Sequence, residues 1–332
     1  MPPDGIRRPV GQTRLGSLVM NLPHVHLLLN HFPVIGMIIG LGLFLCSIVG
    51  KSEDLKRAAL IIFLGIALLT IPAYLSGNAA QLAIKNLPGV SATLIVEHQN
   101  AALLAYVFME IMGAAAWFGL WQFRRNSRLG RGTLSIILLL SVVTVVLMAN
   151  AANIGGAIRH PEILSDPQGT AKVGLGIGLN AAAIGHFIAG GVRWAWATCQ
   201  TLHFMGLSLL MGVVFLVDLR MLGVLKNVSF AAVHRLLPWG MLGFGLNLLT
   251  GMCYFLAAPE QYTKNVTFYW KISLVMVAGL NAIYFTVFDE PWALGARDDA
   301  PLKVKVIAVS AVVLWVGVMF CGLMLPFLGN AF

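Results

Sequence analysis

The sequence predicts an all-α, polytopic integral membrane protein with about eight transmembrane helices in two four-helix halves. Composition is the first reason, since 58% of residues are hydrophobic and 11% are charged, against about 25% charged in soluble domains. A mean hydropathy of +0.84 is the second. The third is length, because 332 residues accommodate about eight spans of roughly 20 residues. These values exclude a soluble globular domain, and we expect the lipid bilayer to surround most of the chain.

Eight apolar runs are each bounded by charged residues or by Pro and Gly clusters. Between the fourth and fifth runs lies the longest connection, whose Gly-rich apolar part predicts a short surface or re-entrant helix. We divide the chain into an N-terminal tail (1–20), a four-helix membrane domain (21–165), an extracytoplasmic connection (166–196) and a second four-helix membrane domain (197–332). The predicted spans are residues 28–49, 57–75, 96–121, 133–153, 197–218, 237–257, 269–288 and 303–327.

Lys and Arg residues are distributed unevenly between the two predicted sides of the membrane. Thirteen of the 22 fall on one side, which the positive-inside rule makes cytoplasmic. Both termini are then extracytoplasmic, and the expected location is the bacterial inner (cytoplasmic) membrane. The net charge of +9 is spread over short tracts, so no nucleic-acid partner is expected. The thirteen are Lys51, Lys56, Arg57, Arg124, Arg125, Arg128, Arg131, Arg220, Lys226, Arg235, Arg297, Lys303 and Lys305.

Seven of the eight histidines fall at or near the predicted outer face. His31, His98 and His203 each lie in the first turn or two of a span that enters from that face, so their imidazoles could share one depth. Intramembrane polar side chains usually face the bundle and meet a partner, and neutral imidazole is the commonest metal ligand. Hydrogen bonding to carbonyls or water is the alternative for any single one. The seven are His24, His26, His31, His98, His160, His186 and His203.

The segment from His26 to Pro33, with two histidines five residues apart before Phe-Pro, resembles the opening of an uncharacterised bacterial four-helix membrane domain. Glu97-His98 and the glycine pair before His160 resemble later marks of that family, although Leu27 replaces its usual Pro. Members of that family are found fused to Rieske or cytochrome c domains, so the resemblance implies a role in membrane electron transfer. The second half resembles, more weakly, another uncharacterised four-helix membrane domain through His203-Phe-Met-Gly206.

A four-helix bundle can hold a b-type haem (heme b) between two axial ligands on facing helices. His31 and His98 suit this arrangement, whereas His26 lies about 140° around the helix from His31, so both are unsuited to one iron. His203 and His160 are reserve metal ligands. Arg159 and Arg193 could pair with haem propionates, or with phospholipid headgroups instead. The chain has no Cys-x-x-Cys-His, so any haem is held non-covalently.

Glu110 lies near the middle of the third predicted span, where an ionised carboxylate is costly. As a catalytic candidate it would relay protons in quinol chemistry; as a structural residue it would be a neutral hydrogen-bond partner for a neighbouring helix. The two alternatives stay open.

We therefore expect an electron-transfer subunit and a candidate member of a quinone-linked oxidoreductase complex. It would carry electrons between the quinone pool and an extracytoplasmic partner, which is a cytochrome c, Rieske or dehydrogenase subunit. Two other classes remain open. One is a cofactor-free membrane anchor or assembly subunit of a respiratory or dehydrogenase complex, and the other is a transporter of small solutes or metal ions, which would need polar groups near the midplane of both halves.

Overall fold

The computed structural model describes residues 22–160, 173–287, 292, 295, 297–325 and 327. Within these ranges every regular element is a helix and none is a strand. Eight helices are long and apolar enough to cross a membrane, which confirms the predicted fold class. Each contains most of one predicted apolar run, in the predicted order. The expected N-terminal tail lies outside the described residues.

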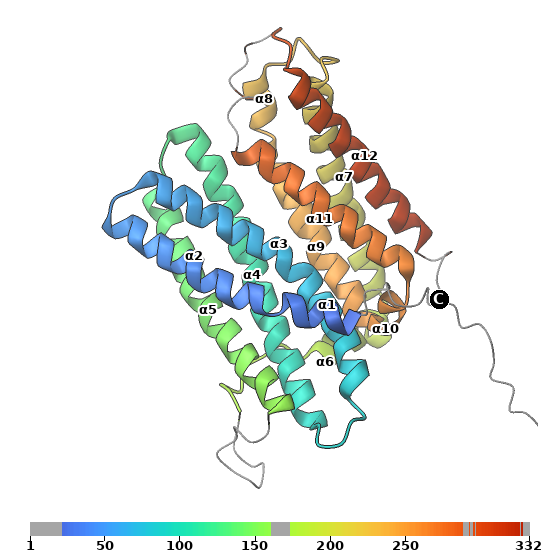
Figure 1. Cartoon of the computed structure of the whole chain (residues 1–332). Coiled ribbons are helices and arrows are strands. Elements are labelled where there is room, and N and C mark those ends of the chain that lie inside the picture. Colours follow the sequence, from blue (N-terminus) through green and yellow to red (C-terminus); the bar gives the residue numbers. More distant parts are fainter. Residues whose placement is uncertain are drawn as a thin grey trace, which may run out of the picture.

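The first half is a bundle of four spans (Figure 1). The first span begins at Leu22, six residues before the predicted start, and therefore includes His24 and His26. Ser52 and Ser91 cap the second and third spans by accepting the amide hydrogens of Leu55 and Leu94. The elements of this half are α1 (Leu22–Leu29), α2 (His31–Val49), α3 (Glu53–Ile84), α4 (Ala92–Asn126) and α5 (Arg131–Arg159).

The second half lies beside the first and contains the other four spans (Figure 1). It is preceded by a short apolar helix, Ala181–Gly191, in the stretch where a surface or re-entrant helix was predicted. The elements are α6 (Ala181–His186), the π-helical turn η2 (Phe187–Gly191), α7 (Ala195–Met221), α8 (Phe230–His234), α9 (Leu237–Ala257), α10 (Pro259–Thr263), α11 (Val266–Val287) and α12 (Leu302–Met324).

Large apolar side chains cover the outside of both halves. Ile35, Leu139 and Val313 are exposed, and each lies within a span. Apolar side chains on the outside of a long helix are stable only against lipid, because water would oppose their exposure. The structure is therefore that of a multi-pass membrane protein.

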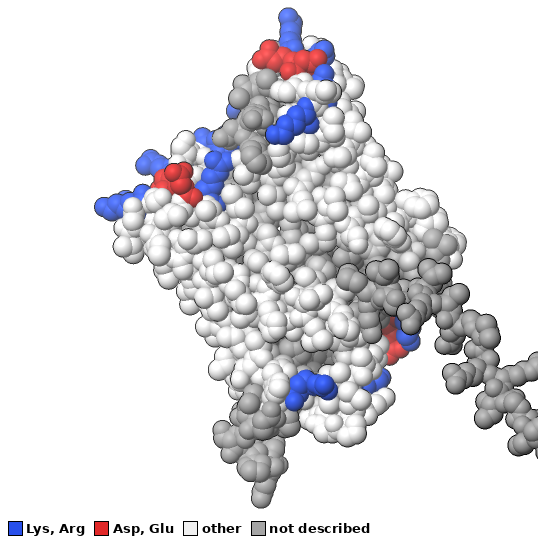
Figure 2. All heavy atoms as spheres, in the orientation of Figure 1, with Lys and Arg blue, Asp and Glu red and all other residues white. Residues whose placement is uncertain are grey.

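The two ends of the molecule differ in charge. Lys and Arg gather at the end that holds the α2–α3 and α4–α5 turns and α8, and few lie at the opposite end (Figure 2). We call the first the basic end, which includes Lys56, Arg124 and Lys226. The opposite end is the histidine end, which includes His26, His98 and His203.

The two halves are joined by an apolar contact and a polar one. The rings of Tyr74 and Tyr106 of the first half lie 4.8 Å apart, tilted by 32°, and pack with Phe255 and Phe268 of the second. At the basic end, the guanidinium groups of Arg57 and Arg124 donate to the carbonyl oxygens of Val287 and Phe285. These carbonyls lie in the last turn of α11, where positive charge is favourable.

Candidate functional site

His26 is seated against α3 by a hydrogen bond and a close contact. Its Nδ1 lies 2.9 Å from the carbonyl oxygen of Ala73 and 3.5 Å from the hydroxyl of Ser76. One turn beyond Ala73, a Cβ atom at Gly77 would lie 3.2 Å from the imidazole Cε1. Any larger residue at this position would crowd the ring. We call this combination of a backbone carbonyl and a glycine on the adjacent helix the seat of the imidazole.

His98 is seated in the same way against α5. Its Nδ1 lies 2.9 Å from the carbonyl oxygen of Ala151. Four residues later, a Cβ atom at Gly155 would lie 2.8 Å from the imidazole Cε1, closer than real Cβ contacts. The surroundings of His26 and His98 are therefore alike. Each imidazole contacts a carbonyl of the adjacent helix and the glycine four residues after that carbonyl.

These seats determine which nitrogen of each ring is available. A carbonyl oxygen only accepts hydrogen bonds, so Nδ1 of His26 and of His98 carries the hydrogen. In the neutral imidazole the lone pair is then on Nε2, the atom that can bind a metal. The two rings are also close enough to interact electrostatically. The site therefore offers two imidazoles of fixed orientation from α1 and α4.

Residues 173–181, which lead into α6, are held against α4 and α5 by two asparagines. Asn100, two residues after His98, accepts the amide hydrogen of Leu179 with its carbonyl and that of Ala181 with its side chain. Asn150, next to Ala151, accepts the amide hydrogen of Leu175 at 2.7 Å. We call residues 173–181 the cover segment. It is fixed to the two helices that carry His98 and its acceptor.

Glycines give the cover segment its path. Gly174 and Gly176 have φ values of +86° and +65°, which side chains rarely allow. A Cβ atom at Gly178 would lie 2.7 Å from the backbone of Asn100. In the Gly-x-Gly-x-Gly sequence of residues 174–178, the first two glycines thus allow the backbone to turn, and the third allows close contact with α4.

The first predicted pair, His31 and His98, is not brought together in the structure. His31 is the first residue of α2 and is exposed on the outside of the bundle. His26 is turned inward instead, and the two residues lie about 140° apart around their helix, so they cannot face the same way. Because the helix begins at Leu22, the earlier histidine already lies within the bundle.

His203 occupies a separate place in the second half. Its Nδ1 lies 2.8 Å from the hydroxyl of Thr250, which donates its own hydrogen to the carbonyl of Leu246 at 2.7 Å. The ring packs edge to face with Tyr254 at 5.6 Å. The hydroxyl therefore accepts from Nδ1, and Nε2 is again the available nitrogen of the neutral ring.

The other predicted ligands lie at the surface of the histidine end. His160 is the exposed cap residue that follows α5. Arg159 is exposed and lies one turn beyond Gly155, on the helix that seats His98. Arg193 is exposed in the turn before α7, in the half that holds His203. Of the two arginines, Arg159 is the one near the paired imidazoles.

Glu110 lies in α4 beside Tyr106, close enough for the two side chains to interact electrostatically. Its Oε1 is sealed from solvent and has no hydrogen-bond partner, and the same is true of the Tyr106 hydroxyl. The expected structural hydrogen bond from Glu110 Oε1 to a neighbouring helix is absent. The carboxyl remains a candidate proton acceptor, three turns of α4 away from His98.

Sequence reasoning did not identify Asn100 and Asn150, which hold the cover segment, or the seats at Gly77 and Gly155. The glycine pair at 155 and 156 was a visible signal, but the role of its first member depends on which helix packs beside it. Nothing in the sequence distinguishes Ala73 or Ala151 as acceptors, because they act through backbone carbonyls.

Comparison with known proteins gives a resemblance over part of the chain and no activity. Residues 181–328 are similar to a family of unknown function, DUF6644. This match starts at the first residue of α6 and includes α12, so it contains His203 but neither His26 nor His98. No curated protein and no solved structure matches the chain.

Proposed function

We propose that the protein is an electron-transfer subunit of the membrane that holds one b-type haem between His26 and His98. The matched seats of these two imidazoles carry the proposal. Histidines that bind metals almost always donate their other ring nitrogen to a carbonyl, carboxylate or water, which fixes the ring and its tautomer. Both residues have this arrangement, His26 on α1 and His98 on α4 of the first half.

The donor set fits a haem better than a bare ion. Within the described ranges, no group of three or more His, Cys, Asp or Glu side chains could hold a metal ion. An iron already held by a porphyrin needs only axial ligands from the protein, and two imidazoles supply them. The haem, when bound, provides one-electron chemistry.

The remaining roles belong to residues of this chain. The carbonyls of Ala73 and Ala151 hold the two rings with Nε2 free. The cover segment limits access of water from the histidine end, and Arg159 is positioned at that surface for a propionate. Buried apolar residues Ala151 and Ile154 lie on the same helix as Gly155. Exclusion of water favours a stable redox centre, because dielectric and solvent access set its potential.

We further propose that electrons pass between the quinone pool and an extracytoplasmic redox partner, which is a cytochrome c, Rieske or dehydrogenase subunit. The concentration of Lys and Arg at the basic end supports an extracytoplasmic partner, because the positive-inside rule makes that end cytoplasmic. The paired histidines then lie near the outer face, within reach of a soluble protein.

The test is an optical spectrum of the purified protein in its oxidised and dithionite-reduced forms. A bis-imidazole haem gives a Soret band and reduced bands that both His26→Ala and His98→Ala should abolish. His31→Ala and His186→Ala are the matched controls and should retain them, since both residues are exposed. Protein that contains no haem when it is produced with ample haem supply contradicts the proposal and favours a cofactor-free anchor.

A further inference from the structure

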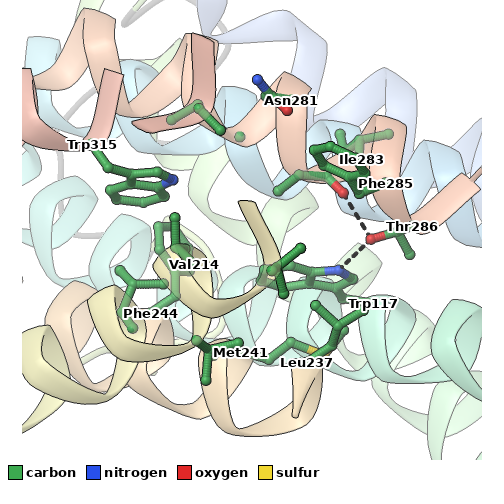
Figure 3. Close-up of a pocket in the computed structure, with 18 of the residues that line it drawn as sticks. Trp117, Val214, Leu237, Met241, Phe244, Asn281, Ile283, Phe285, Thr286 and Trp315 are labelled. Carbon is green, nitrogen blue, oxygen red and sulfur yellow. Dashed lines mark hydrogen bonds between the residues drawn. The ribbon is translucent and has the colours of Figure 1, made fainter. Parts of the chain in front are cut away.

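An apolar cavity of about 90 Å³ lies between the two halves, in the part of the bundle toward the basic end (Figure 3). Leu64 and Trp117 of the first half and Phe244 and Trp315 of the second line it. A cavity of about 150 Å³ in another protein takes up benzene, so the space here is of the order of one six-membered ring with room at its opening. It is separate from the histidine pair.

Aromatic rings stand among the mostly aliphatic walls of the cavity. The ring of Phe244 lies edge to face with Trp117 at 6.2 Å and with Trp315 at 6.4 Å. Aromatic side chains favour edge-to-face and offset contacts with a further ring. A flat ring bound in the cavity could therefore make such contacts with Trp117, Phe244 and Trp315.

The polar atoms of the cavity that have no partner are hydrogen-bond acceptors. Asp218 is 2% exposed, lines the cavity, and its Oδ2 has no hydrogen-bond partner. Oδ1 of Asn281, another lining residue, also has none. By contrast, the indole of Trp117 donates to Thr286, which donates to the carbonyl of Ala282 (Figure 3).

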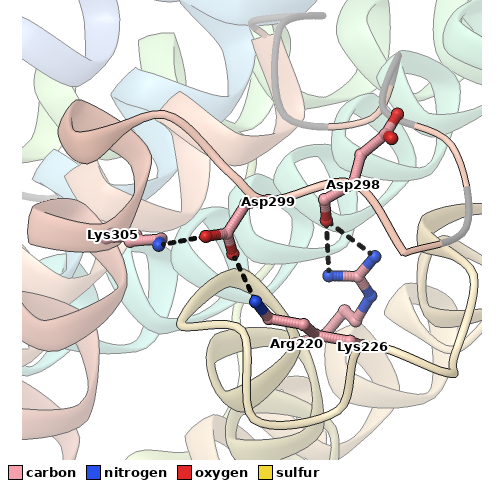
Figure 4. A network of polar contacts seen from close by, with 5 residues as sticks. All are labelled: Arg220, Lys226, Asp298, Asp299 and Lys305. Carbon is pink, nitrogen blue, oxygen red and sulfur yellow. Dashed lines mark hydrogen bonds and ion pairs between the residues drawn. The ribbon is translucent and has the colours of Figure 1, made fainter.

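Among the described residues, no Lys or Arg forms an ion pair with Asp218. Arg220, two residues later, is fully buried, but its guanidinium lies over the ring of Phe230 and donates to the carbonyls of Val228 and Asp298 (Figure 4). A buried acceptor without a partner is costly. A ligand that occupies this cavity and brings a hydrogen-bond donor would remove that cost.

We propose that this cavity binds the hydroxylated ring of a membrane quinol, with Asp218 accepting the hydrogen of one ring hydroxyl. The ring would lie among Trp117, Phe244 and Trp315, and the apolar tail of the quinol would extend toward lipid. An acyl chain could fill the same space, but it offers no donor to Asp218. This inference rests on the proposed function, because it assigns the site of the reactant from the quinone pool.

The experiment is a binding titration of the purified full chain, monitored by quenching of its tryptophan fluorescence. The probes are a short-chain quinol kept reduced under argon and the dimethyl ether of the same quinol, which cannot donate. We expect saturable quenching by the quinol and binding of the ether weaker by about tenfold or more, since the ether leaves the buried acceptor of Asp218 without a partner. Equal affinity for the two probes would overturn the proposal in favour of an apolar-tail site.

Two variants locate the site, each with a control. Asp218→Leu keeps the approximate volume and should make the two probes bind equally, and Ala282→Leu should reduce binding of both by filling the cavity. Glu260→Gln and Ala152→Leu, at exposed positions away from the cavity, should leave both affinities unchanged. Retention of wild-type discrimination by Asp218→Leu would overturn the proposal. Quinol binding without a Soret band refutes the proposed haem and leaves the quinol site standing. A Soret band without quinol binding refutes the quinol site and leaves the haem standing.

Discussion

At the scale of single residues, the partner of Nδ1 and the neighbouring glycine distinguish His26 and His98 from the other histidines. Several histidines share the same end of the molecule, and depth alone does not separate them. His31 and His186 are exposed, whereas His26 and His98 each meet a backbone carbonyl at 2.9 Å. The seat thus defines which imidazoles are oriented for a shared ligand.

The first prediction concerns the glycine that seats His98. In Gly155→Ala the new Cβ would lie 2.8 Å from the imidazole, so the ring must move, and haem content should fall about tenfold or more. Gly156→Ala is the matched control, because a Cβ there meets nothing within 4 Å and alanine favours a helix. Haem per protein, from the Soret-to-protein absorbance ratio, is the measurement. Equal haem content in the two variants would contradict the seat.

The second prediction concerns pH. Hydrogen bonding to Lys305, with Lys226 also nearby, holds the pKa of Asp299 below its usual value (Figure 4). A carboxyl whose folded pKa is lowered stabilises the protein above its unfolded pKa, about 3.9, and loses this as pH falls through the folded pKa. Asp299→Asn should melt slightly below wild type at pH 7, and the difference should vanish near pH 3. A difference that persists there would show that it arises from packing.

Sequence reasoning located the histidines at one end but chose His31 over His26. Hydropathy sets the start of a span where the apolar run begins, at about residue 28, and the polar residues before it are then assigned to the loop. The helix in fact extends back to Leu22, since helical hydrogen bonding does not require apolar side chains. A two-turn error in the start of a helix therefore changed which histidine faces inward.

At the scale of elements, the cover segment shows how asparagines can fix a chain that has no regular structure. Asn100 and Asn150 satisfy three backbone amides of the segment. Such contacts replace the hydrogen bonds that a helix would make internally. A short helix after the Gly-rich stretch was predictable from composition, but its anchoring was not, because the contacts join residues far apart in the chain.

The third prediction tests this anchoring. Asn150→Ala removes the acceptor of the Leu175 amide, which should cost about 1–3 kcal/mol and expose the segment. Limited proteolysis should then cleave within residues 173–181 faster than in wild type. Asn153→Ala, an exposed position on the same helix, should not change the rate, and an equal acceleration there would assign the effect to α5 as a whole.

At the scale of the whole molecule, two four-helix halves enclose a boundary that is apolar at its centre and polar at the basic end. The helix count and the division into halves followed from the apolar runs. The cavity between the halves did not, because Trp117, Phe244 and Trp315 come from three helices whose packing no local pattern specifies.

The fourth prediction concerns orientation. Because the basic end should face the cytoplasm, alkaline phosphatase fused after Phe332 should be active, and the same enzyme fused in the α4–α5 turn after Gly130 should be inactive. Green fluorescent protein at the two positions should give the opposite result. Reversal of both patterns would place the paired histidines on the cytoplasmic side and exclude an extracytoplasmic electron partner.

The capping of α11 by Arg57 and Arg124 has a consequence for modularity. The region similar to DUF6644 begins at residue 181, yet the carbonyls at the end of its α11 are satisfied by guanidinium groups from another part of the chain. A protein composed of that region alone must obtain cations for this helix end elsewhere, from a paired subunit, from its own loop or from the solvent at the membrane surface. In this chain the first half supplies the cations that cap a helix of the second, so the second half depends on the first for that helix end.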